Sequence, residues 1–331
     1  MQNQEYKKFK ERRNSVRRFD FLIRKTDLFE SEKRLQERRE SVLFGQKLLS
    51  RIAVKPPYYA LKNLEKVDGS LKASIPIEQS LGNETSPLTA GETSRHLAIL
   101  GSCALAEKNT NDFSYYLAVK AVYRRHIKEI KADYLIGVSE AKMLNKRKGK
   151  AFNKLLNEKN EVITTLDVDY TIISQNLFER QFKKHKRDMR HSYISESFFN
   201  RQNFYKCLFE IPNAKIQDDI LTLDIGEVKP EMCMGHFPFY PAMPVAFLSQ
   251  ILFNVSINYL KTVLKKKNIK VVLHEGNINA FALVFSGKHI KVKVQLLDQV
   301  KNIFIFFSQL IEQETSKLLI ELNNLKVEIV V

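Results

Sequence analysis

GHFPFYPAMP, the sequence of residues 235–244, is the most informative stretch of this 331-residue chain. It holds one histidine, His236, followed by prolines at positions 238, 241 and 244, which restrict the backbone and argue against a helix before the last of them. Residues 245–266, directly after that proline, are apolar enough for a long buried helix. The stretch therefore predicts a stiff loop that presents a histidine at the beginning of a helix.

The order of predicted elements is similar on both sides of a charged segment at residues 175–203. The first half predicts a helix at 91–107 and strands at 66–78, 115–123, 134–141 and 162–173. The second half predicts the helix at 245–266 and strands at 220–227, 270–274, 280–286, 289–297, 303–309 and 318–330. Each half thus reads strand, loop, helix and then several consecutive strands. This order predicts an α+β fold in which each of two antiparallel sheets wraps around one long helix.

Four segments are expected along the chain. Residues 1–58 form a helical, basic N-terminal arm that ends at Pro56-Pro57. Residues 59–175 and 216–331 form two similar domains, and residues 176–215 form a basic connecting segment.

The net charge of +17 at pH 7 comes mainly from two clusters. The clusters are Lys7, Lys8, Lys10, Arg12, Arg13, Arg17, Arg18, Arg38 and Arg39, and Lys183, Lys184, Lys186, Arg187 and Arg190. Glutamates interrupt the first cluster, which favours a solvated, salt-bridged helix pair over a nucleic-acid-binding arm. A basic surface can serve nucleic acid, anionic lipid or an acidic protein partner, and net charge alone does not choose among them.

Several protein classes are excluded by composition. No apolar run reaches the roughly 18 residues of a spanning helix, and the polar start of the chain is no secretory signal. Cys103, Cys207 and Cys233 are far apart and form no metal-ligand pair. We therefore expect free thiols in a reducing cytoplasm, with no membrane span, no metal and no cofactor.

Residues 235–244 resemble the active-site loop of the β-hydroxyacyl-acyl carrier protein dehydratases, whose pattern is GHFPGxPxxPG. In that family the loop precedes the central helix of a hotdog fold. The resemblance covers these ten residues directly and the rest of the second half by order of elements. It implies a tandem, or double, hotdog whose second half carries the histidine loop.

Three residues depart from the family pattern. Phe239 and Val245 stand where the family has glycine, and Gln250 stands at the position of the catalytic acid. In the first half, alignment of the two helix starts puts Gly82 at the histidine position and His96 at the acid position. The resemblance therefore implies one retained site, in which His236 faces the first-half helix, as in the single-site double hotdogs of polyketide synthases.

The resemblance also assigns roles to residues. His236 would be the base that takes a proton from carbon 2 of a 3-hydroxyacyl thioester, and His96 or Glu92 would protonate the leaving hydroxyl. As an alternative, His96 is a hydrogen-bonded core histidine and Glu92 a partner of the helix dipole. The substrate would contact the loop and the two helix starts, through Gly235, Phe237, Pro238, Val245 and Gly91.

The function implied is that of a dehydratase-like hydro-lyase acting on carrier-bound 3-hydroxyacyl or polyketide thioesters. Fatty-acid, polyketide or pigment-type biosynthesis would be its setting, and an aromatising dehydratase is included. The expected partner is an acidic acyl carrier protein, and the sequence leaves open whether the chain forms a homodimer or a heteromer. Two alternatives stand beside this function: another hotdog enzyme such as a thioesterase, and a catalytically inactive or nucleic-acid-binding hotdog protein.

Overall fold

The computed structural model describes residues 42–109, 113–128, 132, 134–187, 204–207, 211 and 215–330. Residues 1–46 are a unit of their own, of which only the helical residues from 42 onward are described. Most of the expected arm at residues 1–58, with its basic cluster, therefore lies outside the described residues, as does much of the connecting segment 176–215. The second unit, residues 47–331, carries the elements discussed below.

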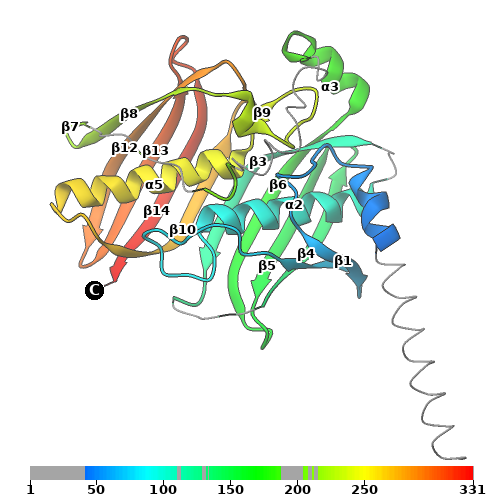
Figure 1. Cartoon of the computed structure of the whole chain (residues 1–331), viewed down its shortest axis with the longest axis horizontal. Coiled ribbons are helices and arrows are strands. Elements are labelled where there is room, and N and C mark those ends of the chain that lie inside the picture. Colours follow the sequence, from blue (N-terminus) through cyan, green and yellow to red (C-terminus); the bar gives the residue numbers. More distant parts are fainter. Residues whose placement is uncertain are drawn as a thin grey trace, which may run out of the picture. The chain divides into compact units, whose positions relative to one another are not determined.

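Among the described residues, twelve strands form one antiparallel sheet (Figure 1). The strands of its first half, in spatial order, are β1 (Lys62–Val67), β2 (Ser70–Ile75), β4 (Leu135–Asn145), β5 (Lys148–Leu156), β6 (Val162–Ser174) and β3 (Ser114–Arg125). Those of the second half are β10 (Lys270–Ala280), β14 (Leu318–Val330), β13 (Ile303–Glu312), β12 (His289–Val300), β8 (Ile220–Glu227) and β7 (Lys215–Gln217).

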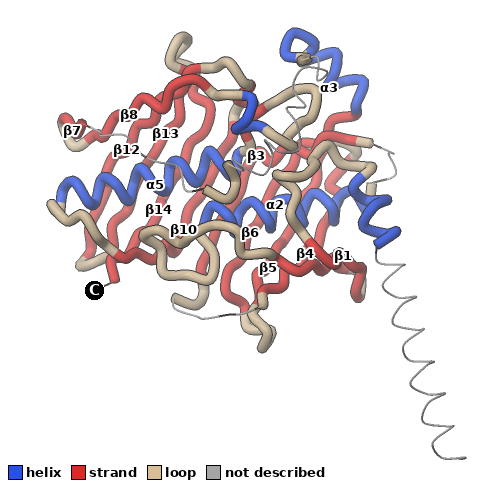
Figure 2. Tube along the Cα trace, viewed as in Figure 1, coloured by secondary structure: helices blue, strands red, loops and turns tan. Residues whose placement is uncertain are grey.

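Two long helices pack on this sheet, α2 (Ala90–Lys108) on the first half and α5 (Val245–Val263) on the second (Figure 2). Both are buried along most of their length because they contact the sheet and each other. The start of α2 is capped twice: the Thr89 hydroxyl accepts the Glu92 N–H at 3.1 Å, and the Glu84 carboxylate accepts the Ala90 N–H at 2.8 Å. These caps satisfy backbone donors that a helix start leaves unpaired.

The two halves of the sheet are joined by β3 and β10. Their register runs over five residue pairs, from Glu275 opposite Arg124 to Asn279 opposite Lys120. Because β3 also pairs with β6 and β10 with β14, these five pairs make one continuous sheet of the two halves. They also bring α2 and α5 into contact.

The expected α+β class, with a large antiparallel sheet and two long helices, is confirmed. Some of the expected strands are wrong in detail. Residues 66–78 hold the end of β1, a turn and β2 instead of one strand, because Asp68 and Gly69 adopt φ angles of 48° and 80° and reverse the chain. Residues 270–274 and 280–286 form one long strand, β10, followed by the short β11 (Val284–Phe285), which pairs with β9 (Ala242–Met243).

Strand β5 was missed altogether. Its inward positions hold Gly149, Ala151, Asn153 and Leu155, so it lacks a run of large apolar residues. The structure shows why these residues are small: a Cβ added at Gly149 would lie 2.4 Å from Leu105 Cδ2 of α2. The sheet approaches the helix closely at this strand. Large apolar residues at every second position, which would have predicted a strand, have no space there.

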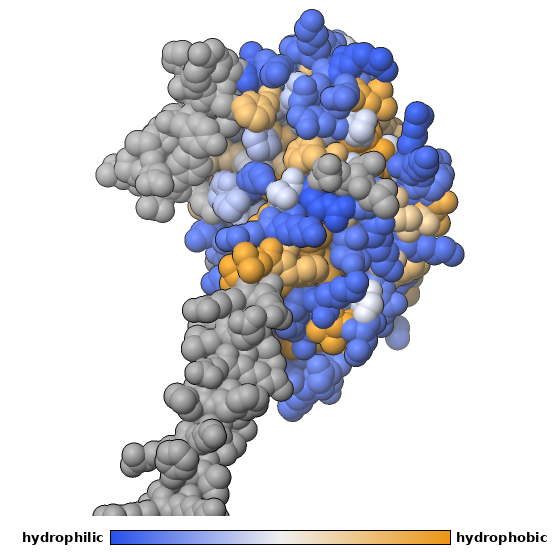
Figure 3. Space-filling model, turned by 90° about the vertical axis from the view of Figure 1, so that its right-hand side faces the viewer, coloured by the Kyte–Doolittle hydropathy of each residue, from blue (hydrophilic) through white to orange (hydrophobic). Residues whose placement is uncertain are grey.

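None of the described helices combines the length and the apolar character that crossing a membrane requires. The face shown in Figure 3 is mainly hydrophilic, with small separate hydrophobic areas. Lys183, Lys184, Lys186 and Arg187 of the second basic cluster are exposed, and Arg190 lies outside the described residues.

We predict that Gly91→Ala destabilises the fold. A Cβ at Gly91 would lie 2.5 Å from Cβ of Gln250, where α2 meets α5. Alanine is favoured over glycine within helices by about 1 kcal/mol, whereas overpacking a close contact typically costs about 1–3 kcal/mol. Denaturant unfolding should therefore show a lower free energy of unfolding for the variant. A gain of about 1 kcal/mol would mean that the helices do not meet at this residue.

Candidate active site

The loop that carries His236 is held by a segment from far earlier in the chain. The Lys55 N–H donates to the Gly235 carbonyl at 2.8 Å, and Val54 forms an isolated antiparallel bridge with His236. Gly235 has a φ of +80°, and a Cβ there would lie 2.2 Å from the Lys55 carbonyl oxygen. Only glycine allows this approach, so the residue before the histidine supports the loop through its backbone.

The ring of His236 has a defined orientation. Its Nδ1 lies 2.8 Å from the Ala242 carbonyl oxygen, and its ring centroid is 5.0 Å from that of Tyr58 and 3.9 Å from that of Phe237. A carbonyl oxygen can accept a hydrogen bond but cannot donate one, so we assign the hydrogen to Nδ1, which leaves a lone pair on Nε2. Burial lowers the pKa of His236 to about 4. At neutral pH the side chain is therefore an uncharged base.

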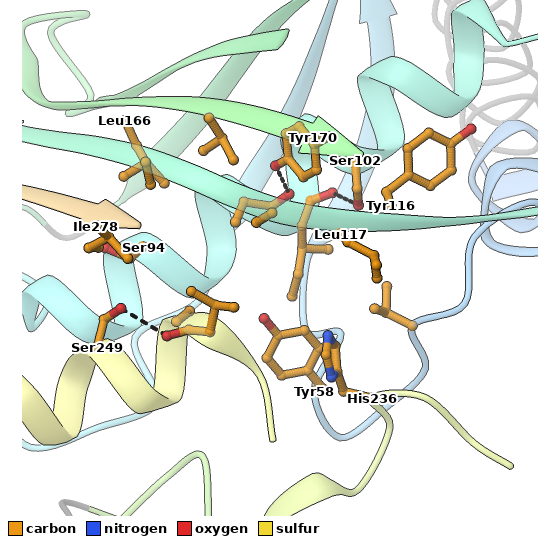
Figure 4. A pocket seen from close by; sticks show the side chains of 18 of the residues that line it. Tyr58, Ser94, Ser102, Tyr116, Leu117, Leu166, Tyr170, His236, Ser249 and Ile278 are labelled. Carbon is orange, nitrogen blue, oxygen red and sulfur yellow. Dashed lines mark hydrogen bonds between the residues drawn. The ribbon is translucent and has the colours of Figure 1, made fainter. Parts of the chain in front are cut away.

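His236 borders a cavity of about 70 Å³ (Figure 4). Residues of α2, α5, β3 and β6 line it together with the Tyr58 segment, and most of them are apolar. The apolar side chains are Val54, Ala98, Ile99, Leu117, Ala118, Ala121, Leu166, Val168, Phe237, Val245, Ala246, Ile278 and Leu283. No aspartate, glutamate, lysine or arginine is found among the described residues that line this cavity. It suits an uncharged, apolar group.

Some hydroxyl groups in the cavity are already engaged with the backbone. Ser102 donates to the Ile99 carbonyl at 2.7 Å, Ser249 to the Val245 carbonyl at 2.8 Å, and Tyr170 to the Ala98 carbonyl at 2.6 Å. These bonds are drawn as dashed lines in Figure 4.

Two hydroxyl groups in the cavity are available to a ligand. Within the described part of the chain, the buried Ser94 Oγ has no hydrogen-bond partner, and no hydrogen bond joins the Tyr58 hydroxyl to another residue. Burial raises the pKa of the Tyr58 hydroxyl above its ordinary value, so this group keeps its proton. Both residues can donate a hydrogen bond to a ligand beside His236.

Glu92 and His96 are not among the residues that line the cavity. Two residues apart on a helix point about 200° apart, so Glu92 and His96 face away from Ser94 and Ala98. The Glu92 carboxylate accepts the N–H groups of Glu78 and Gln79 at 2.6 and 3.3 Å. The structure therefore places the two expected acids on the face of α2 that packs against residues 78–79.

His96 and Glu92 belong to a buried polar cluster with Glu78 and Arg95. His96 Nε2 lies 3.1 Å from Arg95 Nη2 and 3.6 Å from Glu92 Oε1, and Arg95 also forms an ion pair with Glu78. Burial lowers the pKa of His96 well below its usual range and raises that of Glu92. The ligand atoms of Glu78, Glu92 and His96 are within 4.8 Å of one another, but Arg95 already supplies the positive charge that a metal ion would bring.

Gln250 joins the same cluster and not the cavity. Its amide nitrogen donates to the Gln79 side-chain oxygen at 2.6 Å, and Thr89 donates to that oxygen at 3.0 Å. The Gln250 side chain also covers Gly91. Gly91, an expected substrate contact, therefore lies between the two helices and not at the cavity. The cluster connects the start of α2, residues 78–79 and α5.

The residues expected to contact the substrate do not all lie at one cavity. Phe237 and Val245 line the cavity with His236, whereas Pro238 lines a different hollow beside Phe239. Tyr58 and Ser94 were not predicted from the sequence. Tyr58 follows the Pro56-Pro57 pair, which we interpreted only as the end of the arm. Ser94 could have been found from helix geometry alone, because it lies two residues after Glu92 and so points to the opposite side of the helix.

No protein-family model and no curated protein matches this chain in sequence. Solved structures do match in fold. The tesB protein of Mycobacterium avium subs paratuberculosis is 9% identical, with a TM-score of 0.50, and the match covers 81% of this chain and 96% of that one. The 12:0-ACP thioesterase from Umbellularia californica is 6% identical, with a TM-score of 0.50, over 79% of this chain and 98% of that one. At such low identity the likeness shows a shared fold, and the expected hotdog fold is confirmed at that level.

The expectation of a dehydratase, and with it of a hydro-lyase, is wrong. The Umbellularia structure carries the name of a thioesterase, which is a hydrolase. The cavity agrees with this correction, because dehydration needs an acid to protonate the leaving hydroxyl group and no described carboxyl side chain lines the cavity.

We predict that His236 titrates with a pKa of about 4 and is protonated on Nδ1 at neutral pH. NMR of the imidazole carbon and nitrogen resonances between pH 3 and 8 would measure both. The reason is that burial disfavours the charged ring while the Ala242 carbonyl holds the Nδ1 proton. A titration midpoint near the ordinary value of about 6.5 would contradict the described environment of the ring.

Proposed function

We propose that this chain is a thioester hydrolase built as two hotdog halves in tandem, with one active site at His236. The observation that carries the proposal is the neutral imidazole of His236 at an apolar cavity that also holds two available hydroxyl groups and no described carboxyl side chain. An acyl chain would occupy the apolar cavity, with its thioester carbonyl near Tyr58 and His236.

Hydrolysis requires less of the site than dehydration does. His236 Nε2 would take a proton from water as the water oxygen attacks the thioester carbonyl carbon. The tetrahedral intermediate then expels a thiolate, whose conjugate acid has a pKa of about 8.5, so the leaving group needs no strong acid. A base and donors for the carbonyl oxygen are sufficient for this reaction, and His236 would serve as the base.

Donors for the developing negative oxygen come from two directions. The Tyr58 hydroxyl stays protonated, and its ring packs edge-on against that of His236. Val245 and Ala246 line the cavity at the start of α5, where the first backbone N–H groups of a helix have no partner within the helix. Such donors, held in place before the reaction, are typically the strongest contribution to acyl transfer.

The other expected site residues take structural roles in this proposal. Glu92, His96 and Gly91 hold the crossing of α2 and α5, and Gly235 holds the loop. A single site per chain follows, because the first-half loop has Gly82 where a histidine would be needed. The thioester would be bound to a carrier, and an acidic acyl carrier protein suits a chain of net charge +17.

We predict that His236→Asn abolishes most hydrolysis of acyl thioesters. Asparagine can still donate to the Ala242 carbonyl but offers no lone pair at the Nε2 position, so kcat should fall by about 10²- to 10⁴-fold. Release of free thiol from coenzyme A thioesters, tested from acetyl to palmitoyl, measures this. Glu92→Gln is the control, with turnover expressed per folded molecule. An equal fall in kcat for Glu92→Gln would show that Glu92 takes part in the reaction, which contradicts the structural role given to it here.

A second prediction compares two tyrosines of the same cavity. Tyr58→Phe removes an available donor, so kcat should fall toward the 10²- to 10³-fold loss that is typical when such a donor is removed, with a small change in KM. Tyr170→Phe removes a hydroxyl that is already bonded to the Ala98 carbonyl, and kcat should change little. Equal effects on kcat would show that Tyr58 acts by packing alone.

A further inference from the structure

A second, larger hollow of about 660 Å³ adjoins the His236 cavity. We name it the outer pocket, and Leu117, Ala118, Val245 and Leu283 line both spaces. Its walls come from the short helix η1 (Lys183–His185), the segment between β10 and β11, and the turn between β13 and β14. The outer pocket and the His236 cavity therefore lie next to each other and share part of their walls.

The outer pocket is predominantly positive. Three lysines line it, Lys184, Lys288 and Lys317, against one carboxylate, Glu312. Lys288 forms an ion pair with Glu312, and Glu314 also approaches Lys288. Lys184 and Lys317 are exposed and form no ion pair in the described part of the chain, although the charge of Lys317 contributes to the lowered pKa of Glu312. Both ammonium groups can approach a ligand.

The pKa of His185 is affected by the positive charge of the outer pocket. Its ring stacks on that of Phe285, with centroids 3.9 Å apart. Burial and then the nearby charges of Lys184, Lys288 and Arg187 lower its pKa. Lys184 belongs to η1, Arg187 follows two residues after its end, and Lys288 lies just before β12. The wall of the outer pocket is thus a cationic surface backed by aromatic rings.

We propose that the outer pocket binds the phosphate group of the arm that carries the acyl thioester, through Lys184 and Lys317. This rests on the proposed function, which puts the acyl end in the His236 cavity, next to the walls that both spaces share. Thiol carriers of acyl groups end in a phosphopantetheine arm, whose apolar acyl end and anionic far end match the inner cavity and the outer pocket in turn. The phosphate is common to coenzyme A and to a carrier protein.

The test uses two ligands that differ only in this phosphate: S-hexyl-phosphopantetheine and S-hexyl-pantetheine, both of which resist hydrolysis. Calorimetry on the full chain gives the ratio of their dissociation constants. We expect the phosphate to improve binding by about tenfold or more, because ion-assisted hydrogen bonds are among the stronger polar contacts. In Lys184→Gln/Lys317→Gln the ratio should fall to about one, with binding of the pantetheine compound unchanged.

A matched control removes the same charge elsewhere. Lys266→Gln/Lys267→Gln changes two exposed lysines after α5, and the phosphate preference should persist. Equal binding of the two ligands to the wild type would overturn the inference while leaving the proposed function intact. An equal loss of preference in both double variants would overturn it too, because overall charge would then explain the effect. If neither ligand binds, the proposed function fails and the inference with it.

The source of the phosphate can then be distinguished. For the hydrolysed thioesters, KM is compared between wild type and Lys184→Gln/Lys317→Gln, once with acyl-coenzyme A and once with the same acyl group on a carrier protein. The carrier whose KM rises more is the one whose phosphate the outer pocket binds. No rise in KM for either carrier would contradict the proposal.

Discussion

The pairing of β3 with β10 is the contact on which the rest of the structure depends. Five residue pairs join two half-sheets that each carry one long helix, and the helices are thereby brought together. One of these pairs, Ala121 opposite Ile278, also lines the cavity beside His236. The same backbone hydrogen bonds that fuse the halves therefore build the wall of the candidate site, with Ser94 from one helix and Ser249 from the other.

This architecture explains what could be predicted from the sequence. The histidine loop and both long helices follow from local signals, namely spaced prolines and long apolar stretches, and these elements were placed nearly to the residue. Strand β5 was missed because its inward residues are small where the sheet approaches α2. Its amino acids are dictated by a neighbour far away in sequence, which a local pattern cannot reveal.

The site was harder to predict for a similar reason. Tyr58 reaches His236 only because Lys55 bonds to Gly235, a contact between residues 180 positions apart. Alignment of the helix starts correctly directed attention to α2, but it selected the face with Glu92 and His96 instead of the face with Ser94. That choice led to the expectation of dehydration, because an acid opposite His236 implies that reaction, whereas the proposed hydrolysis rests on hydroxyl donors and a neutral base.

The charged side chains discussed above lie in two places, at the crossing of the two helices and in the outer pocket. Glu78, Glu92 and Arg95 lie together at the crossing of the helices: Arg95 forms an ion pair with Glu78, and Glu92 accepts the backbone N–H groups of residues 78 and 79. They therefore help to specify how α2 fits against residues 78–79. The cavity itself is free of charged side chains among its described residues, and the available lysines stand outside it. In the proposed complex, the apolar acyl chain would lie in the uncharged cavity and the anionic part of its carrier would lie beside the lysines of the outer pocket.

The most direct test of the central claim is a crystal structure of the full chain with S-hexyl-phosphopantetheine bound. The account predicts electron density for the hexyl chain in the cavity between α2 and α5, with the sulfur close to His236 Nε2 and the Tyr58 hydroxyl. Density for the hexyl chain in any other hollow, with the His236 cavity unchanged and empty, would contradict it.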